Sequence, residues 1–162
     1  MTDSEKQYFS DMYEKHAKSI YGVSLMYLKN KEDAEEVVGE TFIRIMQANP
    51  TFESDSHERA YLIRTAVNLC ANMLKSSWRK SVVHDEDVLM YMSTPEEESI
   101  MEELLQLPPK YRAVLYMHYY EGYKAQEIAD IMKVSLSAVL SRLARGRKKL
   151  KDILTEGGYF YA

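Results

Sequence analysis

The sequence predicts an all-α protein in which two small helical domains are joined by an acidic linker. Only 6 of the 162 residues are Gly and 4 are Pro, so few residues would interrupt helices. Apolar residues recur at three- and four-residue spacing, which is the period of an amphipathic helix. We find no sustained polar–apolar alternation next to Asn-Gly or Asp-Gly turns, the pattern that indicates strands. We expect the domains at residues 1–80 and 95–162 and the linker at residues 81–94.

Three helices are expected in the first domain, over residues 5–29, 32–47 and 57–80. Asn30-Lys31 separates the first two helices. Asn49-Pro50 ends the second, because the residue before a proline avoids the helical conformation. Ser56 is the expected N-cap of the third, since a serine hydroxyl can accept a hydrogen bond from a free backbone N–H at a helix start.

Residues 81–94 have no convincing helical period and contain an acidic cluster, so we interpret them as a linker. Order resumes at Thr94-Pro95, where Thr can cap a helix and Pro suits the first helical position. That helix is expected to stop at Leu107, before Pro108-Pro109. Further helices are expected over residues 109–121, with Gly122 as the terminator, 124–132 and 135–154.

The charges are distributed unevenly along the chain, whose formal net charge is −4. Residues 59–80 carry five Lys or Arg and residues 133–151 carry seven, with no acidic residue in either segment. Between them, residues 81–106 carry eight Asp or Glu and no Lys or Arg. Because charges act over a Debye length of ~8–10 Å, the two basic segments can attract phosphate despite the acidic total.

Cysteine content, apolar runs and catalytic motifs limit the classes to which the protein can belong. The single cysteine, Cys70, cannot form an internal disulfide, which fits a reducing cytoplasm. We expect no signal peptide and no membrane insertion, because no apolar run approaches the ~18 residues that span a bilayer. We also expect no enzyme, cofactor or metal site, since no catalytic or phosphate-loop motif is found. A helical metalloenzyme is a rival hypothesis, with His84 beside Asp85 and Asp87 as the best metal candidate.

Residues 126–150 have the form of a helix-turn-helix. Ser135 is expected to cap the second helix, and Val139, Leu143 and Leu150 fall on one buried stripe of it. The polar and basic residues of that helix then remain exposed, as reading of the DNA major groove requires. The alternatives are a solvated basic helix on an ordinary bundle and a stand-alone helix-turn-helix regulator that binds duplex DNA as a dimer.

Five short motifs follow one another in residues 107–154: Leu107-Pro108, Glu121-Gly122, Glu127-Ile128-Ala129, Ser141-Arg142-Leu143 and Arg145-Gly146-Arg147. Together they resemble region 4 of the extracytoplasmic-function (ECF) sigma factors of the sigma-70 family. The resemblance implies a recognition helix that reads the −35 promoter duplex through Ser135, Ser137, Ala138, Leu140, Ser141, Arg142, Arg145 and Lys148. This chain has Lys133 where the family often has Gly, Lys124 where it often has a Ser cap, and Leu140 where a cation is usual. These departures predict a less rigid turn and fewer phosphate contacts.

The segment DAEEVVGETFIRI, from Asp33 to Ile45, resembles the second-helix signature of region 2 in the same family. The resemblance implies docking on the clamp helices of the polymerase β′ subunit, through Asp33, Glu36, Glu40, Arg44 and Gln47. Gly39 stands where Gln is common. A Gly inside a helix costs ~1 kcal/mol relative to Ala, so Gly39 indicates close approach of another chain. A purely intramolecular amphipathic helix is the alternative.

The segment AYLIRTAVNLCANMLKSSWRK, from Ala60 to Lys80, resembles the part of region 2 that captures the −10 element. Amides can bond a base edge, aromatic rings can stack on unpaired bases, and cations can follow the phosphates. The resemblance therefore implies −10 contacts from Tyr61, Asn68, Asn72, Lys75, Trp78, Arg79 and Lys80. The alternatives are a core position for Tyr61, packing of Trp78 under the linker, and a structural hydrogen bond for Asn68.

As a whole, the resemblance implies a sigma factor that directs promoter-specific transcription initiation by reading −35 duplex and melted −10 DNA. Its partners would be core RNA polymerase, contacted at the β′ clamp helices and the β flap, promoter DNA and an anti-sigma factor. Polymerase would hold the two domains at a fixed separation. The acidic linker would either thread the polymerase channel used by RNA or fold against the basic segments in the free protein.

Overall fold

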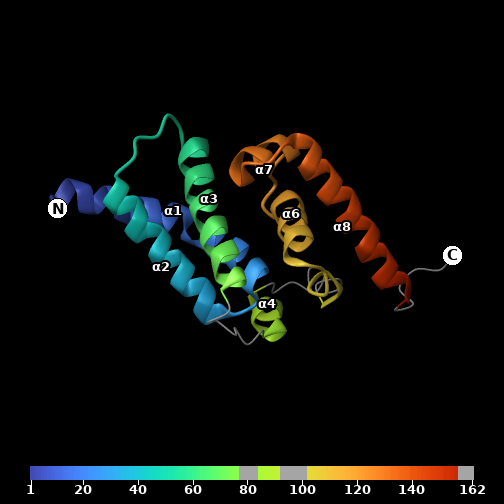
Figure 1. Cartoon of the computed structure of the whole chain (residues 1–162). Coiled ribbons are helices and arrows are strands. Elements are labelled where there is room, and N and C mark those ends of the chain that lie inside the picture. Colours follow the sequence, from blue (N-terminus) through green and yellow to red (C-terminus); the bar gives the residue numbers. More distant parts are fainter. Residues whose placement is uncertain (77–83, 92–101, 157–162) are drawn as a thin grey trace.

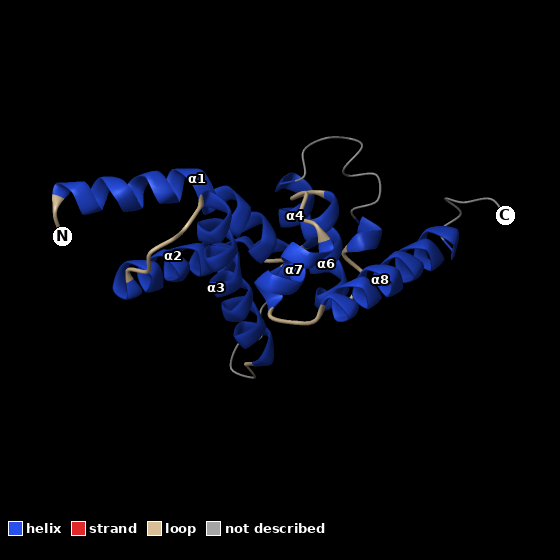
Figure 2. Cartoon of the chain, turned by 90° about the horizontal axis from the view of Figure 1, so that it is seen from above, coloured by secondary structure: helices blue, strands red, loops and turns tan. Residues whose placement is uncertain are grey.

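The structure, a computed structural model, describes residues 1–76, 84–91 and 102–156. Those residues contain helices and no strand, so the all-α prediction is confirmed (Figures 1 and 2). Short helical and turn residues at 102–107 precede α6. The helices are α1 (Asp3–Leu28), α2 (Lys31–Ala48), α3 (Asp55–Lys75), α4 (Asp85–Tyr91), α6 (Pro109–Tyr119), α7 (Ala125–Met132) and α8 (Leu136–Glu156).

The three N-terminal helices each begin at a side-chain cap. The Thr2 hydroxyl accepts a hydrogen bond from the Glu5 amide, and the Asn30 side chain does the same for the Asp33 amide. The cap of α3 corrects the prediction of Ser56. Ser54 Oγ accepts from the His57 amide at 3.1 Å, and Ser56 already lies inside the helix. An N-cap residue has a non-helical backbone, as the extended Ser54 does, whereas the backbone of Ser56 is already helical.

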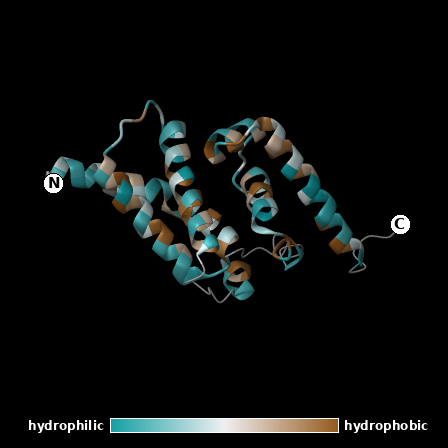
Figure 3. Ribbon diagram, viewed as in Figure 1, coloured by the Kyte–Doolittle hydropathy of each residue, from teal (hydrophilic) through white to brown (hydrophobic). Residues whose placement is uncertain are grey.

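Helix α1 is the centre of the N-terminal lobe, which we define as α1, α2 and α3. Its C-terminal half is buried on nearly every side because it packs against α2, α3 and α6. Hydrophobic and hydrophilic residues alternate along the outer helices, as one-sided burial requires (Figure 3). Ile20, Leu62 and Ile63 are completely buried, and each such side chain contributes ~1.5–3 kcal/mol to folding.

The C-terminal lobe, which we define as residues 102–107 with α6, α7 and α8, contains the expected helix-turn-helix. Gly122, after α6, has a φ of 77°, a backbone conformation that glycine adopts without strain. Lys133 ends α7 in the left-handed conformation, with a φ of 55°. Val139 and Leu143 of α8 are buried and Leu150 is half-buried, as predicted, and they pack α8 on α6 and α7.

The predicted linker contains a helix, which corrects the expectation that residues 81–94 are irregular throughout. Helix α4 packs on α1 through Val88, which is fully buried. Lys29 forms an ion pair of 3.1 Å with Asp85, and the Lys31 amide donates to Asp87 at 3.1 Å. Asp85 and Asp87 therefore contact the junction of α1 and α2.

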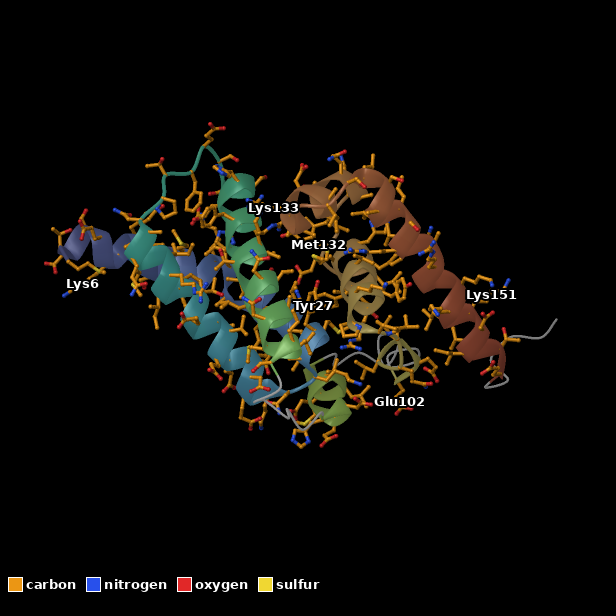
Figure 4. The ribbon with its side chains drawn as sticks, in the orientation of Figure 1. Lys6, Tyr27, Glu102, Met132, Lys133 and Lys151 are labelled. Carbon is orange, nitrogen blue, oxygen red and sulfur yellow. The ribbon has the colours of Figure 1, made fainter. Side chains whose placement is uncertain are left out.

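The two lobes pack directly against each other. Helix α1 contacts α6, and α3 contacts α7, so that α6 and α7 lie between α3 and α8 (Figure 1). The buried apolar residues of both lobes form one continuous core. Tyr27 lies in the middle of the molecule, whereas Lys151 is on the outer side of α8 (Figure 4).

Candidate nucleic-acid interface

The outer face of α8 carries the residues predicted to read DNA. Ser137, Leu140, Arg145 and Lys148 are exposed, and Ser141 is half-buried between them. Residues three and four apart share one face of a helix, so Ser137, Ser141, Arg145 and Lys148 form a continuous polar strip. Leu140 lies at one edge of this strip with half of its surface exposed. The strip combines hydroxyl groups and two cations on one helix, and the major groove of DNA is wide enough to admit a helix.

The turn before α8 holds the start of the helix in place. Ser135 Oγ accepts a hydrogen bond from the Ala138 amide at 3.0 Å, so the predicted cap of α8 is confirmed. The preceding helix begins without a serine cap, and Glu127 instead accepts a hydrogen bond from the Lys124 amide at 2.9 Å, which is the other half of a capping box. Lys133 adopts the left-handed backbone at the position where the family often has Gly, and a residue with a Cβ is strained there.

Two of the predicted −35 residues lie on the inner flank of α8. Ala138 and Arg142 are both half-buried. Arg142 is close enough to Tyr27 for its positive charge to oppose the effect of burial, which raises the pKa of the Tyr27 phenol.

The exposed face of α3 carries the described residues predicted to capture the −10 strand. Asn68, Asn72 and Lys75 are exposed and lie three or four residues apart, so they share one face. Tyr61 is half-buried, with its ring 5.4 Å from that of Phe52 in an edge-on contact, and so belongs partly to the core. Trp78, Arg79 and Lys80 lie outside the described residues.

Two further cations of the first basic segment point at the other lobe. Arg64 donates to the carbonyl of Asp130 at 3.0 Å and to that of Ile131 at 3.2 Å. The Arg59 guanidinium lies 4.5 Å from the centre of the Tyr123 ring, within the range of a cation–π contact. The distribution of charges along the sequence places both arginines in a segment that we expected to attract phosphate. Only the tertiary structure shows that they contact the C-terminal lobe.

The exposed face of α2 carries the residues predicted to contact polymerase. Glu36, Arg44 and Gln47 are exposed, whereas Asp33 and Glu40 are half-buried. Arg44 donates to Glu40 at 3.1 Å, one helical turn away. These residues follow one another at three- or four-residue spacing and form a stripe along the side of α2 that faces away from α1 and α3.

Sequence reasoning missed the apolar part of the α2 face. Ile43 and Met46 lie beside the predicted residues with 46% and 36% of their surface exposed. Gly39 is next to them, and a Cβ added there would meet no atom within 4 Å. The signal that could have found this patch is Ile43, which interrupts the polar face of an otherwise regular amphipathic helix. A shallow groove of about 370 Å³ between α1 and α2 adjoins Gly39.

The described residues offer neither a metal-binding cluster nor a membrane-spanning helix. Among the described residues, no three His, Cys, Asp or Glu side chains are grouped to hold a metal ion. His84 Nδ1 instead lies 3.3 Å from Glu86. None of the described helices is both long and apolar enough to cross a membrane.

Two family models match the chain, one for each lobe. Residues 12–80 match the model described as Sigma-70 region 2, and residues 97–150 match the model described as Sigma-70, region 4. These ranges contain α3 and most of α8, the helices that carry the candidate DNA-binding faces.

Two ECF sigma factors have similar sequences, and a solved sigma factor structure has a similar fold. The ECF RNA polymerase sigma factor SigL of Mycobacterium tuberculosis is 30% identical over 158 residues, covering 91% of this chain and 89% of SigL. SigE of Mycolicibacterium smegmatis, also an ECF sigma factor, is 28% identical over 91% of this chain, which spans 62% of its length. The sigma factor RpoE of Bartonella quintana, solved in complex with the anti-sigma factor NepR, has a similar fold. Its TM-score is 0.70 over 95% of this chain and 98% of that chain, at 16% identity.

Proposed function

Because the chain belongs to the sigma-70 family of RNA polymerase sigma factors and resembles its ECF members, we propose that it directs promoter-specific initiation by core RNA polymerase. It acts as an initiation factor in the cytoplasm, not as an enzyme. The N-terminal lobe, within residues 1–80, is the region 2 domain, and the C-terminal lobe, within residues 95–162, is the region 4 domain. The observation that carries this proposal is the polar strip of α8, presented by a capped helix-turn-helix.

We assign reading of the −35 duplex to the polar strip. Arg145 and Lys148 are exposed at the same side of α8 as Ser137, so cations and hydroxyl groups can reach phosphates and base edges together. Leu140, in place of a cation, offers an apolar contact to a thymine methyl group. Ser135 has a different task, because its hydroxyl is committed to capping α8.

We assign capture of the melted −10 strand to the exposed face of α3. The amides of Asn68 and Asn72 can donate to and accept from the edge of an unpaired base, and Lys75 can follow the backbone. Trp78, Arg79 and Lys80 continue the same segment of sequence. Unstacking costs ~1.4 kcal/mol per base-pair step on average, and contacts to the extruded base offset part of that cost.

We assign docking on the β′ clamp helices to the stripe of α2. The acidic residues give polar contacts at its rim, while Ile43 and Met46 supply the apolar centre that a stable interface needs. Apart from the backbone of α2 itself, no atom of the described residues lies within 4 Å of a Cβ added at Gly39, which supports the proposal that a partner helix approaches the backbone there.

The C-terminal lobe has a second surface suited to a protein partner. A groove of about 320 Å³ between α6 and α8 is lined almost entirely by apolar side chains, namely Leu104, Leu115, Tyr119, Tyr120 and Leu150, with Arg147 at its edge. We assign this groove to the β flap. An anti-sigma factor completes the proposed partners, by analogy with the RpoE complex.

In vitro transcription with purified bacterial core polymerase tests the function. Genomic or promoter-library DNA is transcribed with and without the protein, and the 5′ ends of the RNAs are mapped. The proposal predicts start sites that appear only when the protein is present and that share sequence at −35 and −10. Failure of the purified protein to bind core polymerase, or to change the start sites, would contradict it.

Variants separate the two DNA-reading faces. Arg145→Gln should reduce transcription most from promoters that depend strongly on their −35 element. Asn68→Ala should reduce transcription most from promoters that depend strongly on their −10 element. On a template with a pre-melted −10 region, Asn72→Ala should still reduce complex lifetime, since its partner is single-stranded DNA. Gly39→Leu should lower the affinity for core polymerase without unfolding the chain, because the Cβ position is open.

A further inference from the structure

The groove between α6 and α8 leaves apolar side chains open to solvent. The two helices pack side by side (Figure 1), and the groove between them measures about 320 Å³. Tyr119, which lines it, has 58% of its surface exposed, and Leu150 is half-buried. Covering apolar side chains removes their surface from water, which is favourable. The groove is therefore suited to an apolar occupant in the free protein.

The face of α8 that lines the groove continues to the end of the helix. Arg147, Leu150 and Leu154 follow one another at three- and four-residue spacing, so they share one face. Leu154 is 5% exposed, and Ile153 packs against the core. The last turn of α8 is therefore held against the C-terminal lobe, and the chain leaves the helix beside the face that lines the groove.

The sequence after α8 is rich in aromatic residues. Gly157-Gly158 comes first, and residues 159–161 are Tyr-Phe-Tyr; all of them lie outside the described residues. Consecutive glycines permit the backbone conformations that reverse the direction of a chain. The three aromatic side chains are uncharged and offer a large apolar surface. Arg147, at the edge of the groove, can also lie over the face of an aromatic ring.

These aromatic residues can reach the groove without any change in the lobe. A helix rises ~1.5 Å per residue, so Leu150 lies about 9 Å back along α8 from Glu156. An extended chain spans ~3.3 Å per residue, so residues 159–161 cover about 10 Å once the two glycines have reversed the chain. A short flexible tether gives an effective concentration of about a millimolar, which populates even a weak contact.

We propose that the tail, which we define as residues 157–162, folds back in the free protein and places its aromatic residues in the groove between α6 and α8. Arg147 then lies over one of the rings. The contact itself is carried by the open groove, the exit of α8 and the reach of the tail. Its consequence rests on the proposed function, which assigns the same groove to the β flap: the tail and the flap compete for it.

Paramagnetic broadening in the full chain tests the contact. A nitroxide is attached through Ala162→Cys, beside the aromatic residues, while the native Cys70 is buried and stays unlabelled. Leucine methyl signals are recorded with the nitroxide oxidised and then reduced. Leu62 of α3 is the internal reference and should keep its intensity. At least half of the intensity should be lost by the leucines that line the groove, Leu104, Leu115 and Leu150.

Matched variants separate a specific contact from chance encounters. A polar tail of the same length, made by replacing residues 159–161 with Ser, should restore the leucine signals. Tyr119→Ser removes an exposed ring from the groove and should weaken the broadening, whereas Tyr8→Ser removes an exposed ring from α1 and should not. Circular dichroism checks that each variant keeps its helical content. No broadening in the unmodified chain, or equal broadening with the polar tail, would overturn the proposal.

A mixed sample distinguishes the chain's own tail from that of a second copy. Isotopically labelled protein without a nitroxide is mixed with unlabelled protein that carries one. The groove leucines should keep their intensity in this mixture, because the nitroxide then belongs to another molecule. Broadening in the mixture would assign the groove to a second copy and would overturn the intramolecular contact.

Core polymerase provides the functional arm. If the flap takes the groove, the polar-tail variant should bind core enzyme several-fold more tightly than the unmodified chain. Equal affinities together with intact broadening in the free chain would overturn the competition. If neither chain binds core enzyme, the proposed function is wrong, but the broadening in the free chain still decides whether the tail occupies the groove.

Discussion

Arg112 Nη2 donates to the Tyr27 carbonyl at 2.9 Å, which joins two residues 85 positions apart in the chain. The same guanidinium donates to Met26 and to Leu107, whose carbonyl is 2.6 Å from Nη1. Arg112 is 3% exposed, and burial lowers the pKa of its guanidinium to about 10. It therefore remains charged at neutral pH; its guanidinium donates to backbone carbonyls, and the nearby charge of Asp85 opposes the effect of burial on its pKa.

Replacing Arg112 should destabilise the whole chain. Arg112→Met keeps the apolar stem but leaves three buried carbonyls without a charged donor. Because a hydrogen bond to a charged group contributes ~1.5–3 kcal/mol, we expect the free energy of unfolding to fall by about 2–4 kcal/mol. Urea denaturation followed by circular dichroism measures the change. Lys151→Gln, at an exposed position of α8, is the control and should change stability by less than ~0.5 kcal/mol. Equal losses in the two variants would contradict the assigned role of Arg112.

Lys133→Gly should stabilise the helix-turn-helix. Lys133 has a φ of 55°, and a side chain at such a position costs energy that glycine avoids. We expect a gain of about 0.5–1 kcal/mol, since the greater freedom of glycine in the unfolded chain offsets part of the relief. Thermal unfolding measures it. Lys149→Gly, inside α8, should have the opposite sign and lose ~1 kcal/mol. A loss at Lys133 would show that its side chain has a stabilising contact.

Lys148→Gln should reduce the salt dependence of promoter binding. If Lys148 contacts one phosphate, DNA binding by the variant releases one counterion fewer. The slope of log K against log salt should then become less steep by about 0.9. Binding of the polymerase complex to a fluorescent promoter duplex is titrated between low and physiological salt. Lys6→Gln, at the far N-terminal end of α1, is the matched control (Figure 4). An unchanged slope for Lys148→Gln would remove that residue from the interface.

His16 should make the N-terminal lobe sensitive to mild acid. It is buried, with Nε2 3.7 Å from Glu58, and burial is the main cause that lowers the pKa of its imidazole, with help from the charges of Lys15 and Arg59. As pH falls through 6.5, the unfolded chain takes up a proton at His16 before the folded one, so stability falls.

Glu58 acts in the opposite direction, because burial raises the pKa of its carboxyl. Its folded form holds a proton at a pH where the unfolded form has lost it, so acidification towards 4.5 adds stability. The His16 effect is therefore measured in a Glu58→Gln background, by urea denaturation between pH 7.5 and 5.5. Stability should fall with pH there, and adding His16→Leu should flatten the curve. A curve that His16→Leu leaves unchanged would contradict the prediction.

The prediction of helix ends succeeded where local chemistry decides them and failed where several residues compete. Ser135 was the only hydroxyl at the required spacing before α8, and it is the cap. Ser54 and Ser56 both lie near the start of α3, and the choice of cap depends on where the helical backbone begins, which the sequence pattern does not specify. Helix α4 was missed because it has seven residues, too few to display a helical period.

By itself the sequence determined the longer helices, the buried stripe of α8, the polar strip opposite it and the family, because these depend on spacing within a few residues and on short motifs. The tertiary structure alone decided that Arg64 and Arg112 donate to the last carbonyls of helices in the opposite lobe, and that the Tyr116 hydroxyl packs against α1 at Gly22, where a side chain would leave it no room. Such pairs join residues tens of positions apart, and neither partner changes the local pattern in which it sits. The physical reason is that helix formation is governed by neighbours along the chain, whereas lobe packing is governed by whichever donors and hollows the folded surfaces bring together.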